Sequence, residues 1–183
     1  TTDGGYASPI DALQVGHYII RETDATEGYL VEGNIEQSLV INENSQTYLT
    51  LASNKSFTEQ AIRGGFNFQK NDTDTGTYAQ GDTNLQATLK LVNTSAHSVW
   101  VDSNGDGKFS EDEYYASGAT IKLPQTFVTT GTANTADGTF TTTKEGYFET
   151  TANALPYGSY KIVEVTAPVG FAMDGDSVTE TTF

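Results

Sequence analysis

Residues 15–22 read VGHYIIRE, and the same pattern returns at residues 157–164 as YGSYKIVE. The shift between the two stretches is constant at 142 positions (164 − 22). The match continues downstream with the same shift in the pairs Ala25 and Ala167, Gly28 and Gly170, and Gly33 and Gly175. Across a single-residue gap it also extends upstream to the pairs Gly5 and Gly146, and Tyr6 and Tyr147. Self-similarity of this kind is typical of tandem copies of one domain type.

The two copies are expected to be incomplete, because the chain begins within one copy and ends before the second is finished. We expect residues 1–55 to form the C-terminal part of a first module and residues 56–65 to be a linker. Residues 66–183 are expected to form a second module, which lacks its last strand and carries a large insertion around residues 93–145.

The composition is that of an acidic protein without cysteine. The formal net charge is −15, from 24 acidic and 9 basic residues spread along the chain. Nucleic acids and anionic membranes bind clustered Lys and Arg, so this balance argues against both partners. A chain without cysteine forms no disulfide and no thiolate metal site, whereas its carboxylates are compatible with calcium.

Short runs bounded by turn residues predict an all-β fold. No segment combines an apolar stripe of helical period with caps at both ends. Many short strands with regular turns favour tandem β-sandwich modules. Strands are expected at residues 16–21, 28–32, 37–41, 46–53, 66–70, 85–92, 98–101, 119–128, 139–142, 147–150, 159–165 and 170–173.

Strand alternation points to two charged residues on the core side of the second module. Residues 66, 68 and 70 share one face, and two of them are Phe, which leaves Lys70 at the inner edge. Residues 160, 162 and 164 likewise place Glu164 on a face with Tyr and Ile. A desolvated amine is a nucleophile and a protonated carboxyl transfers protons. The alternative is that both charges lie at strand ends, where they reach solvent or form a simple ion pair.

Four motifs resemble those of one family in the expected order. They are GSYKIVEVTAPVGF at 158–171, the preceding ALPY, FQKNDTDTG at 68–76 and QGDTNL at 80–85. Together they resemble the collagen-adhesin B-type (CnaB, prealbumin-like or SpaA-like) domains of Gram-positive pilins and surface adhesins. The resemblance covers nearly the whole chain and implies a prealbumin-like, reverse-immunoglobulin sandwich.

The resemblance also implies roles for single residues. In that family a lysine on the first strand attacks an Asn or Asp side chain on the last strand, with help from a glutamate, and an intramolecular isopeptide bond results. Lys70 would be the nucleophile and Glu164 the proton shuttle. In the first copy, Glu22 would serve Asn54 as acceptor. Leu49 and Leu51 are out of phase with Asn54, so an inward Asn54 requires a bulge or rests on Tyr48.

Neither copy holds a full triad. The lysine of the first copy would precede Thr1, and the acceptor of the second would fall beyond Phe183. Three outcomes are open: the modules stay unlinked, Asn54 reaches Lys70 within one chain, or Asn54 of one molecule complements the strand-deficient module of another.

Residues 102–113 read DSNGDGKFSEDE and fit a twelve-residue calcium loop at every required position. Residues 98–101 before the loop read as a strand and residues 114–118 after it do not read as a helix, so the flanks are not those of an EF-hand and the loop is expected to brace the insertion. The alternative is an acidic Asn-Gly/Asp-Gly hairpin without a metal. The expected oxygen ligands are Asp102, Asn104, Asp106, Lys108 through its carbonyl, Ser110 and Glu113.

The leading expectation is a structural stalk or backbone module of a Gram-positive adhesin or pilus, extracellular, attached to the cell wall and crosslinked wherever a triad is complete. The alternative is a calcium-dependent module that binds a host ligand or glycan through the 93–145 insertion. Expected partners are neighbouring modules, and another copy by strand complementation. We expect no turnover enzyme, since isopeptide formation occurs once per molecule.

Overall fold

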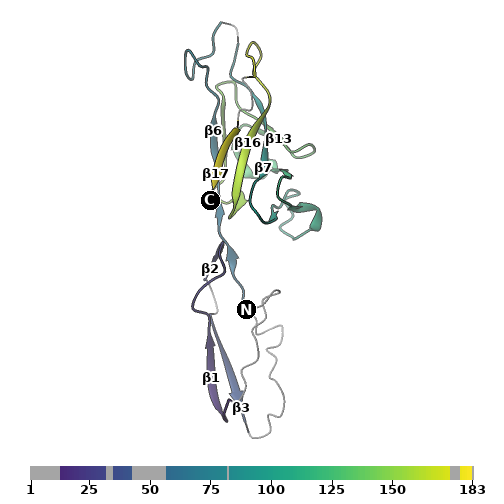
Figure 1. Cartoon of the computed structure of the whole chain (residues 1–183). Coiled ribbons are helices and arrows are strands. Elements are labelled where there is room, and N and C mark those ends of the chain that lie inside the picture. Colours follow the sequence, from purple (N-terminus) through teal and green to yellow (C-terminus); the bar gives the residue numbers. More distant parts are fainter. Residues whose placement is uncertain (1–12, 32–34, 43–56, 82, 174–177, 183) are drawn as a thin grey trace. The chain divides into compact units, whose positions relative to one another are not determined.

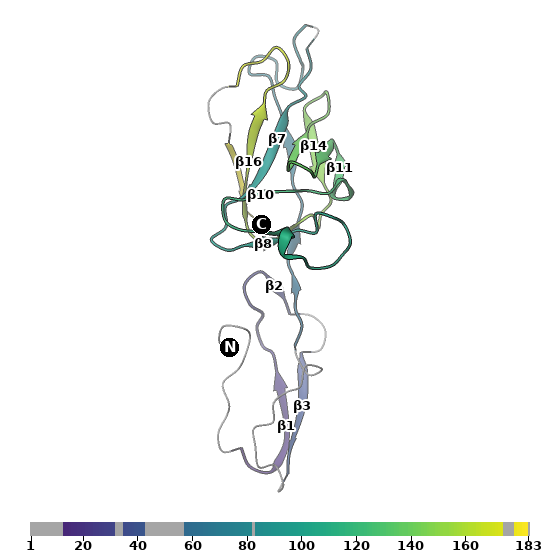
Figure 2. The same ribbon diagram turned by 90° about the vertical axis from the view of Figure 1, so that its right-hand side faces the viewer.

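The computed structural model describes residues 13–31, 35–42, 57–81, 83–173 and 178–182, the last of these as backbone only (Figures 1 and 2). These residues form strands and two short 3-10 helices, with no α-helix among them. The prediction of an all-β protein is therefore confirmed for the described chain. No helix within these ranges is long and apolar enough to cross a membrane.

The chain divides into two compact units, Thr1–Gln60 and Ala61–Phe183. In the first unit, β1 (Gly16–Arg21) pairs antiparallel with β3 (Glu36–Ile41). The end of this hairpin is held by Arg21, whose Nε donates to Oε1 of Glu36 at 2.6 Å. The unit also contains β2 (Tyr29–Leu30), and the division between the units falls within β4 (Gln60–Ala61).

The second unit holds a larger sheet in the order β12-β13-β7-β16-β17, with β10 beside β13 along the same edge of β7. β7 and β16 lie side by side in both views (Figures 1 and 2). The bounds are β7 (Thr88–Asn93), β10 (Thr120–Ile121), β12 (Thr132–Asn134), β13 (Thr139–Thr141), β16 (Ser159–Thr166) and β17 (Val178–Thr182).

A smaller sheet has the order β11-β14-β6, and two short strand pairs complete the unit. The smaller sheet consists of β6 (Asn67–Gln69), β11 (Val128–Thr130) and β14 (Tyr147–Thr150). The pairs are β5 (Arg63–Gly64) with β15 (Leu155–Pro156), and β8 (Val99–Trp100) with β9 (Tyr114–Tyr115). The 3-10 helices are η2 (Glu111–Glu113) and η3 (Gln125–Phe127).

One hydrophobic core joins the two sheets. The ring centroid of Phe148 in β14 lies 4.3 Å from that of Phe140 in β13 and 5.7 Å from that of Phe66, which precedes β6. Tyr160 and Ile162 of β16 belong to the same buried cluster. Side chains from both sheets thus fill one interior, as in a β-sandwich.

Some expected strands differ from those observed. Residues 170–173 form no strand, so that prediction is wrong. The run 119–128 is divided, because Pro124 has no N–H to donate to a ladder and begins the 3-10 turn η3. The expected linker 56–65 contains β4 and β5, and β5 pairs within the second unit. The expected strand at 46–53 lies outside the described residues.

The two copies of the repeat form hairpins of the same register. Tyr18 faces Leu39 across β1 and β3, and the same positions shifted by 142 are Tyr160 and Thr181, which face each other across β16 and β17. All five pairs of the second hairpin correspond in this way to pairs of the first. The sequence repeat is therefore also a repeat of strand pairing.

A tyrosine hydrogen bond repeats with the hairpin. The Tyr18 hydroxyl donates to the carbonyl of Gln14 at 2.7 Å, and the Tyr160 hydroxyl donates to the carbonyl of Pro156 at 2.6 Å. Tyr160 is fully buried whereas Tyr18 is only half-buried. Burial raises the pKa of Tyr160 well above its usual range, so its hydroxyl stays protonated and remains a donor.

We expect Tyr160→Phe to lower the stability of the second unit by about 1–2 kcal/mol, because a buried carbonyl loses its donor. Tyr18→Phe is the matched control and should cost less than about 0.5 kcal/mol, because solvent can reach that site. Urea unfolding followed by circular dichroism measures both. Equal losses for the two variants would show that burial does not govern the strength of this bond.

Candidate functional site

Lys70 and Glu164 meet in the second unit although 94 positions separate them. Lys70 directly follows β6, and its backbone N–H donates to the carbonyl of Gly146 at 2.8 Å. Glu164 lies in β16, opposite Leu89 of β7. The Lys70 Nζ lies 2.9 Å from Oε1 of Glu164 and donates to Oε2 at 3.1 Å. The structure thus brings the two predicted residues into one ion pair.

Strand alternation places this pair at the rim of the core. Phe66 is buried and Phe68 is packed against the core cluster, while Asn67 and Gln69 are exposed. The Lys70 side chain continues this inward series and is 20% exposed. Glu164 continues the buried series of β16, and its side chain is only 3% exposed. The ion pair is therefore largely desolvated, mostly on the carboxylate side.

The turn that follows Lys70 is held by Asp72. Its Oδ1 accepts from the backbone N–H of Asp74 at 2.8 Å and of Thr75 at 3.3 Å, and its Oδ2 accepts from Nε2 of Gln80 at 2.8 Å. These hydrogen bonds lower the pKa of Asp72 below its usual range, and the bond from Gln80 has the largest effect. The chain immediately after the lysine is thereby kept in one conformation.

β6 has a strand on one side only among the described residues. Phe68 of β6 faces Phe148 of β14, and no described strand pairs with the opposite edge. Lys70 lies directly after this edge strand. A strand added there would gain main-chain hydrogen bonds, as edge strands generally allow. Its side chains would then pass beside Nζ of Lys70.

The corresponding glutamate of the first unit has a different partner. The Glu22 backbone N–H donates to the carbonyl of Ile35 at 2.9 Å. A hydrogen bond with the carboxyl of Glu59, then burial and repulsion by that same group, raise the pKa of Glu22 above its usual range. Glu22 therefore faces a second carboxyl where Glu164 faces a lysine. Asn54 lies outside the described residues.

Gly146 positions Lys70, and no predicted role fell on it. Its φ is +83°, and a Cβ there would lie 2.5 Å from the carbonyl oxygen of Lys70. Only glycine lets the start of β14 approach Lys70 this closely without strain. The repeated pair Gly5 and Gly146 was the available signal.

The predicted calcium loop connects β8 to β9. A strand was expected before the loop, and the strand after it was not predicted. Asp102 uses both carboxylate oxygens, since Oδ1 accepts from the N–H of Gly105 at 2.8 Å and of Asp106 at 3.1 Å, and Oδ2 accepts from that of Gly107 at 2.9 Å. Asn104 Oδ1 accepts from the N–H of Asp106 at 2.8 Å. The loop is thus folded around the first of its expected ligands.

The remaining expected ligands are spread along the loop. Asp106 Oδ1 accepts from the N–H of Lys108 at 2.8 Å, and Asp106 and Lys108 are both exposed. Ser110 precedes η2, and Glu113 ends it. Glu113 is buried at 5% exposure, and its Oε1 accepts from the N–H of Asn104 at 2.8 Å. Within the described ranges, no three His, Cys, Asp or Glu side chains already converge as a metal-holding group.

An aromatic cluster lies next to this loop. Phe109 is 65% exposed, with its ring centroid 6.3 Å from that of Trp100 and 6.1 Å from that of Tyr114, which is 53% exposed. The guanidinium of Arg63 lies 5.4 Å from the Trp100 ring centroid, within cation–π range. Arg63 could not be predicted as part of this cluster, because nothing in the local sequence links β5 to residue 100.

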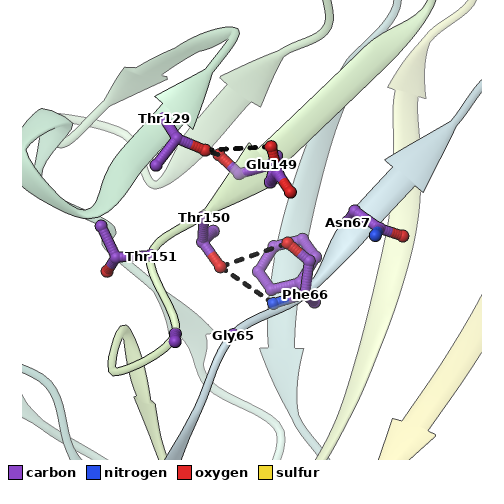
Figure 3. A pocket seen from close by; sticks show the side chains of 8 residues that line it. Gly65, Phe66, Asn67, Thr129, Glu149, Thr150 and Thr151 are labelled. Atoms are coloured by element: carbon purple, nitrogen blue, oxygen red, sulfur yellow. Dashed lines mark hydrogen bonds between the residues drawn. The ribbon is translucent and has the colours of Figure 1, made fainter.

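An open depression of about 690 Å³ lies apart from these residues, beside the start of β6 (Figure 3). Thr150 closes one side, since its Oγ1 accepts from the Phe66 N–H at 2.9 Å and donates to the Phe66 carbonyl at 3.2 Å. No residue with a predicted role lines it. The lining residues are Gly65, Phe66, Asn67, Thr129, Glu149, Thr150, Thr151 and Ala152.

A comparison with known families matches residues 64–181 to the SpaA prealbumin-like fold domain. The chain belongs to this family. The predicted family and its β-sandwich fold are thereby confirmed. The SpaA match spans Lys70, Glu164 and the loop 102–113, so the ion pair and the insertion belong to one SpaA domain. A comparison with curated proteins found no match.

Proposed function

We propose that this chain is a structural module of a Gram-positive pilin or surface adhesin in which Lys70 forms an isopeptide bond with an Asn or Asp side chain. SpaA domains are typical of such extracellular, multidomain surface proteins. The observation that carries the crosslink is the desolvated Lys70–Glu164 pair beside the open edge of β6. The acceptor side chain would be carried by a strand added at that edge.

In the proposed reaction, Glu164 would accept the proton of Lys70 and return a proton to the leaving nitrogen. When the ammonium of Lys70 transfers a proton to Glu164, the pair becomes a neutral amine and a neutral carboxyl. This transfer costs less free energy in a desolvated site than in water, because burial destabilises the two charged forms. The amine then attacks the side-chain carboxamide carbon of an Asn. A C–N bond forms, the original C–N bond breaks, and protons that pass through the Glu164 carboxyl let the nitrogen leave as ammonia. An Asp acceptor would release water instead.

A bond of this kind would have a mechanical use. It joins the first strand of the module to the added strand, so that tension along the chain cannot separate them. By analogy with a disulfide, closing a long loop also stabilises by about 2–4 kcal/mol, chiefly by restricting the unfolded chain. The chain has no cysteine with which to obtain this constraint otherwise.

Intact mass under denaturing conditions, with a denaturing gel beside it, tests the crosslink. The full chain is measured alone and after incubation with a synthetic peptide of residues 46–56, which contains Asn54. Loss of one ammonia in the monomer indicates a bond within the chain, a covalent ladder indicates complementation between molecules, and an adduct with the peptide minus one ammonia indicates strand addition in trans.

The matched variants are Lys70→Arg, which keeps the charge but removes the nucleophile, and Lys161→Arg on β16. We expect the first to abolish every crosslinked species and the second to leave them unchanged, while Asn54→Ala identifies the donor of the carboxamide. An unmodified mass in all wild-type samples, or a crosslink that persists in Lys70→Arg, would contradict the proposal.

The second candidate function is calcium-dependent binding of a host ligand or glycan by the 93–145 insertion. The exposed rings of Phe109 and Tyr114 support it, because sugars stack on aromatic faces and exposed aromatic patches mark binding surfaces. Binding to immobilised neutral oligosaccharides should then fall in Phe109→Ser. Tyr78→Ser, which removes an aromatic ring that is 77% exposed elsewhere in the unit, should leave binding unchanged.

A further inference from the structure

Glu113 carries a buried carboxylate in the β8–β9 insertion. Its backbone is held across the hairpin, since the Val101 N–H donates to the Glu113 carbonyl at 3.1 Å. Its side chain turns toward the loop, where Oε1 accepts from the Asn104 N–H at 2.8 Å. Oε2 is buried and has no hydrogen-bond partner among the described residues.

A buried carboxylate oxygen without a partner is costly, and native proteins seldom retain one. No lysine or arginine of the described chain forms an ion pair with Glu113 within 4.0 Å. A cation at Oε2 would supply the missing partner. Oε1 is hydrogen-bonded to the backbone of Asn104, at the third position of the loop. The unpaired oxygen Oε2 therefore belongs to a carboxylate whose orientation toward the loop is already fixed.

We infer that residues 102–113 form a calcium site in which Glu113 is the buried anchor. Asp102, Asn104 and Asp106 supply side-chain oxygens, and Lys108 supplies its backbone carbonyl. Gly107, at the sixth position with φ +72°, makes the sharp turn that such a loop requires. Ser110 completes the set directly or through water.

The donor set selects calcium over other common cations. Every donor is oxygen, whereas zinc and copper favour the imidazole and thiolate ligands that this loop lacks. Six expected oxygen ligands from the loop itself suit Ca²⁺, which takes six to eight, better than Mg²⁺, which usually keeps several of its waters. Because the carboxylates have not converged in the described structure, binding is expected to draw the exposed part of the loop toward Glu113.

The site is independent of the proposed crosslink, since it lies on the insertion and uses neither Lys70 nor Glu164. Its role is to brace the insertion by tying the start of the loop to its end. Trp100 is the single tryptophan of the chain and stands two positions before Asp102. Its fluorescence therefore reports on this loop.

Calorimetric titration of the full chain with CaCl₂, after treatment with a chelator, tests the inference. We expect one Ca²⁺ per chain, a dissociation constant of about 10⁻⁴–10⁻³ M or tighter as in extracellular calcium modules, and a change in Trp100 fluorescence with the same midpoint. MgCl₂ at equal concentration should produce neither signal. Thermal unfolding with and without calcium should show a higher melting temperature in calcium.

Glu113→Gln keeps the shape and the hydrogen bond from Asn104 but removes the charge. We expect at least a tenfold weaker affinity for Ca²⁺, whereas Glu111→Gln, an exposed neighbour in the same 3-10 turn, should match wild type. The order of stability should also depend on calcium. In chelator, Glu113→Gln should be at least as stable as wild type, and in calcium it should be less stable than wild type. The inference would be overturned if the wild-type chain did not bind Ca²⁺ at a concentration of about ten times the upper expected dissociation constant. Unchanged affinity in Glu113→Gln would also overturn it.

Discussion

Lys70→Met is expected to destabilise the unlinked second unit by about 3 kcal/mol, the lower end of the cost of breaking a buried ion pair. The reason is asymmetric burial. The Glu164 side chain is 3% exposed and would keep a charge without a partner, whereas the Lys70 side chain, at 20%, has some access to solvent. Urea unfolding of a sample whose mass is that of the unlinked chain measures the loss.

Two further variants show whether the loss comes from the unpaired carboxylate. Lys70→Met combined with Glu164→Leu removes both charges and should recover most of the lost stability, because replacing a buried pair by apolar groups is often neutral. Lys161→Met, on the same strand as Glu164, should change stability by less than about 0.5 kcal/mol. If the double variant were as unstable as Lys70→Met alone, the stability would depend on packing by the lysine stem instead.

Phe148→Ala is expected to cost about 3–5 kcal/mol, the usual range for truncating a fully buried Phe. Phe148 has no exposed surface and contacts the rings of Phe140 and Phe66, so it joins the two sheets. Its loss leaves a cavity that both sheets would have to close. Chemical unfolding of the variant, followed by near-ultraviolet circular dichroism, measures the effect.

Phe109→Ala is the matched control, since it removes a ring of the same size that is 65% exposed. It should change stability by less than about 0.5 kcal/mol. A loss at Phe148 no greater than at Phe109 would mean that the three-ring cluster does not hold the sheets together.

The position of the ion pair was predictable from strand alternation and family resemblance. Phe66 and Phe68 mark one face of β6, and Tyr160 and Ile162 mark one face of β16, so the next residue of each series is directed inward. The resemblance then linked Lys70 to Glu164 across the sandwich. The distances show that the two charges are paired in the structure, which the sequence alone does not give.

Contacts between segments far apart in the chain escaped prediction. Arg63 reaches the ring of Trp100, and the carboxyl of Glu59 reaches that of Glu22, through folding that no local pattern records. The division of the run 119–128 could have been foreseen at Pro124. The strand β17 could have been foreseen from the repeat, since the expected strand at 37–41 shifted by 142 positions falls on 179–183.

The sequence by itself determined the all-β class, the repeat and the family, and it supplied the candidate residues for the proposed chemistry. These follow from local periodicity and motif spacing, which every segment carries within itself. For the residues that the structure describes, the tertiary structure alone decided which charges are paired, which carboxylate oxygen of Glu113 is buried without a partner, and which edge of β6 has no neighbouring strand. Burial and pairing depend on what the rest of the chain places around a side chain, and that is settled only when the sheets pack together.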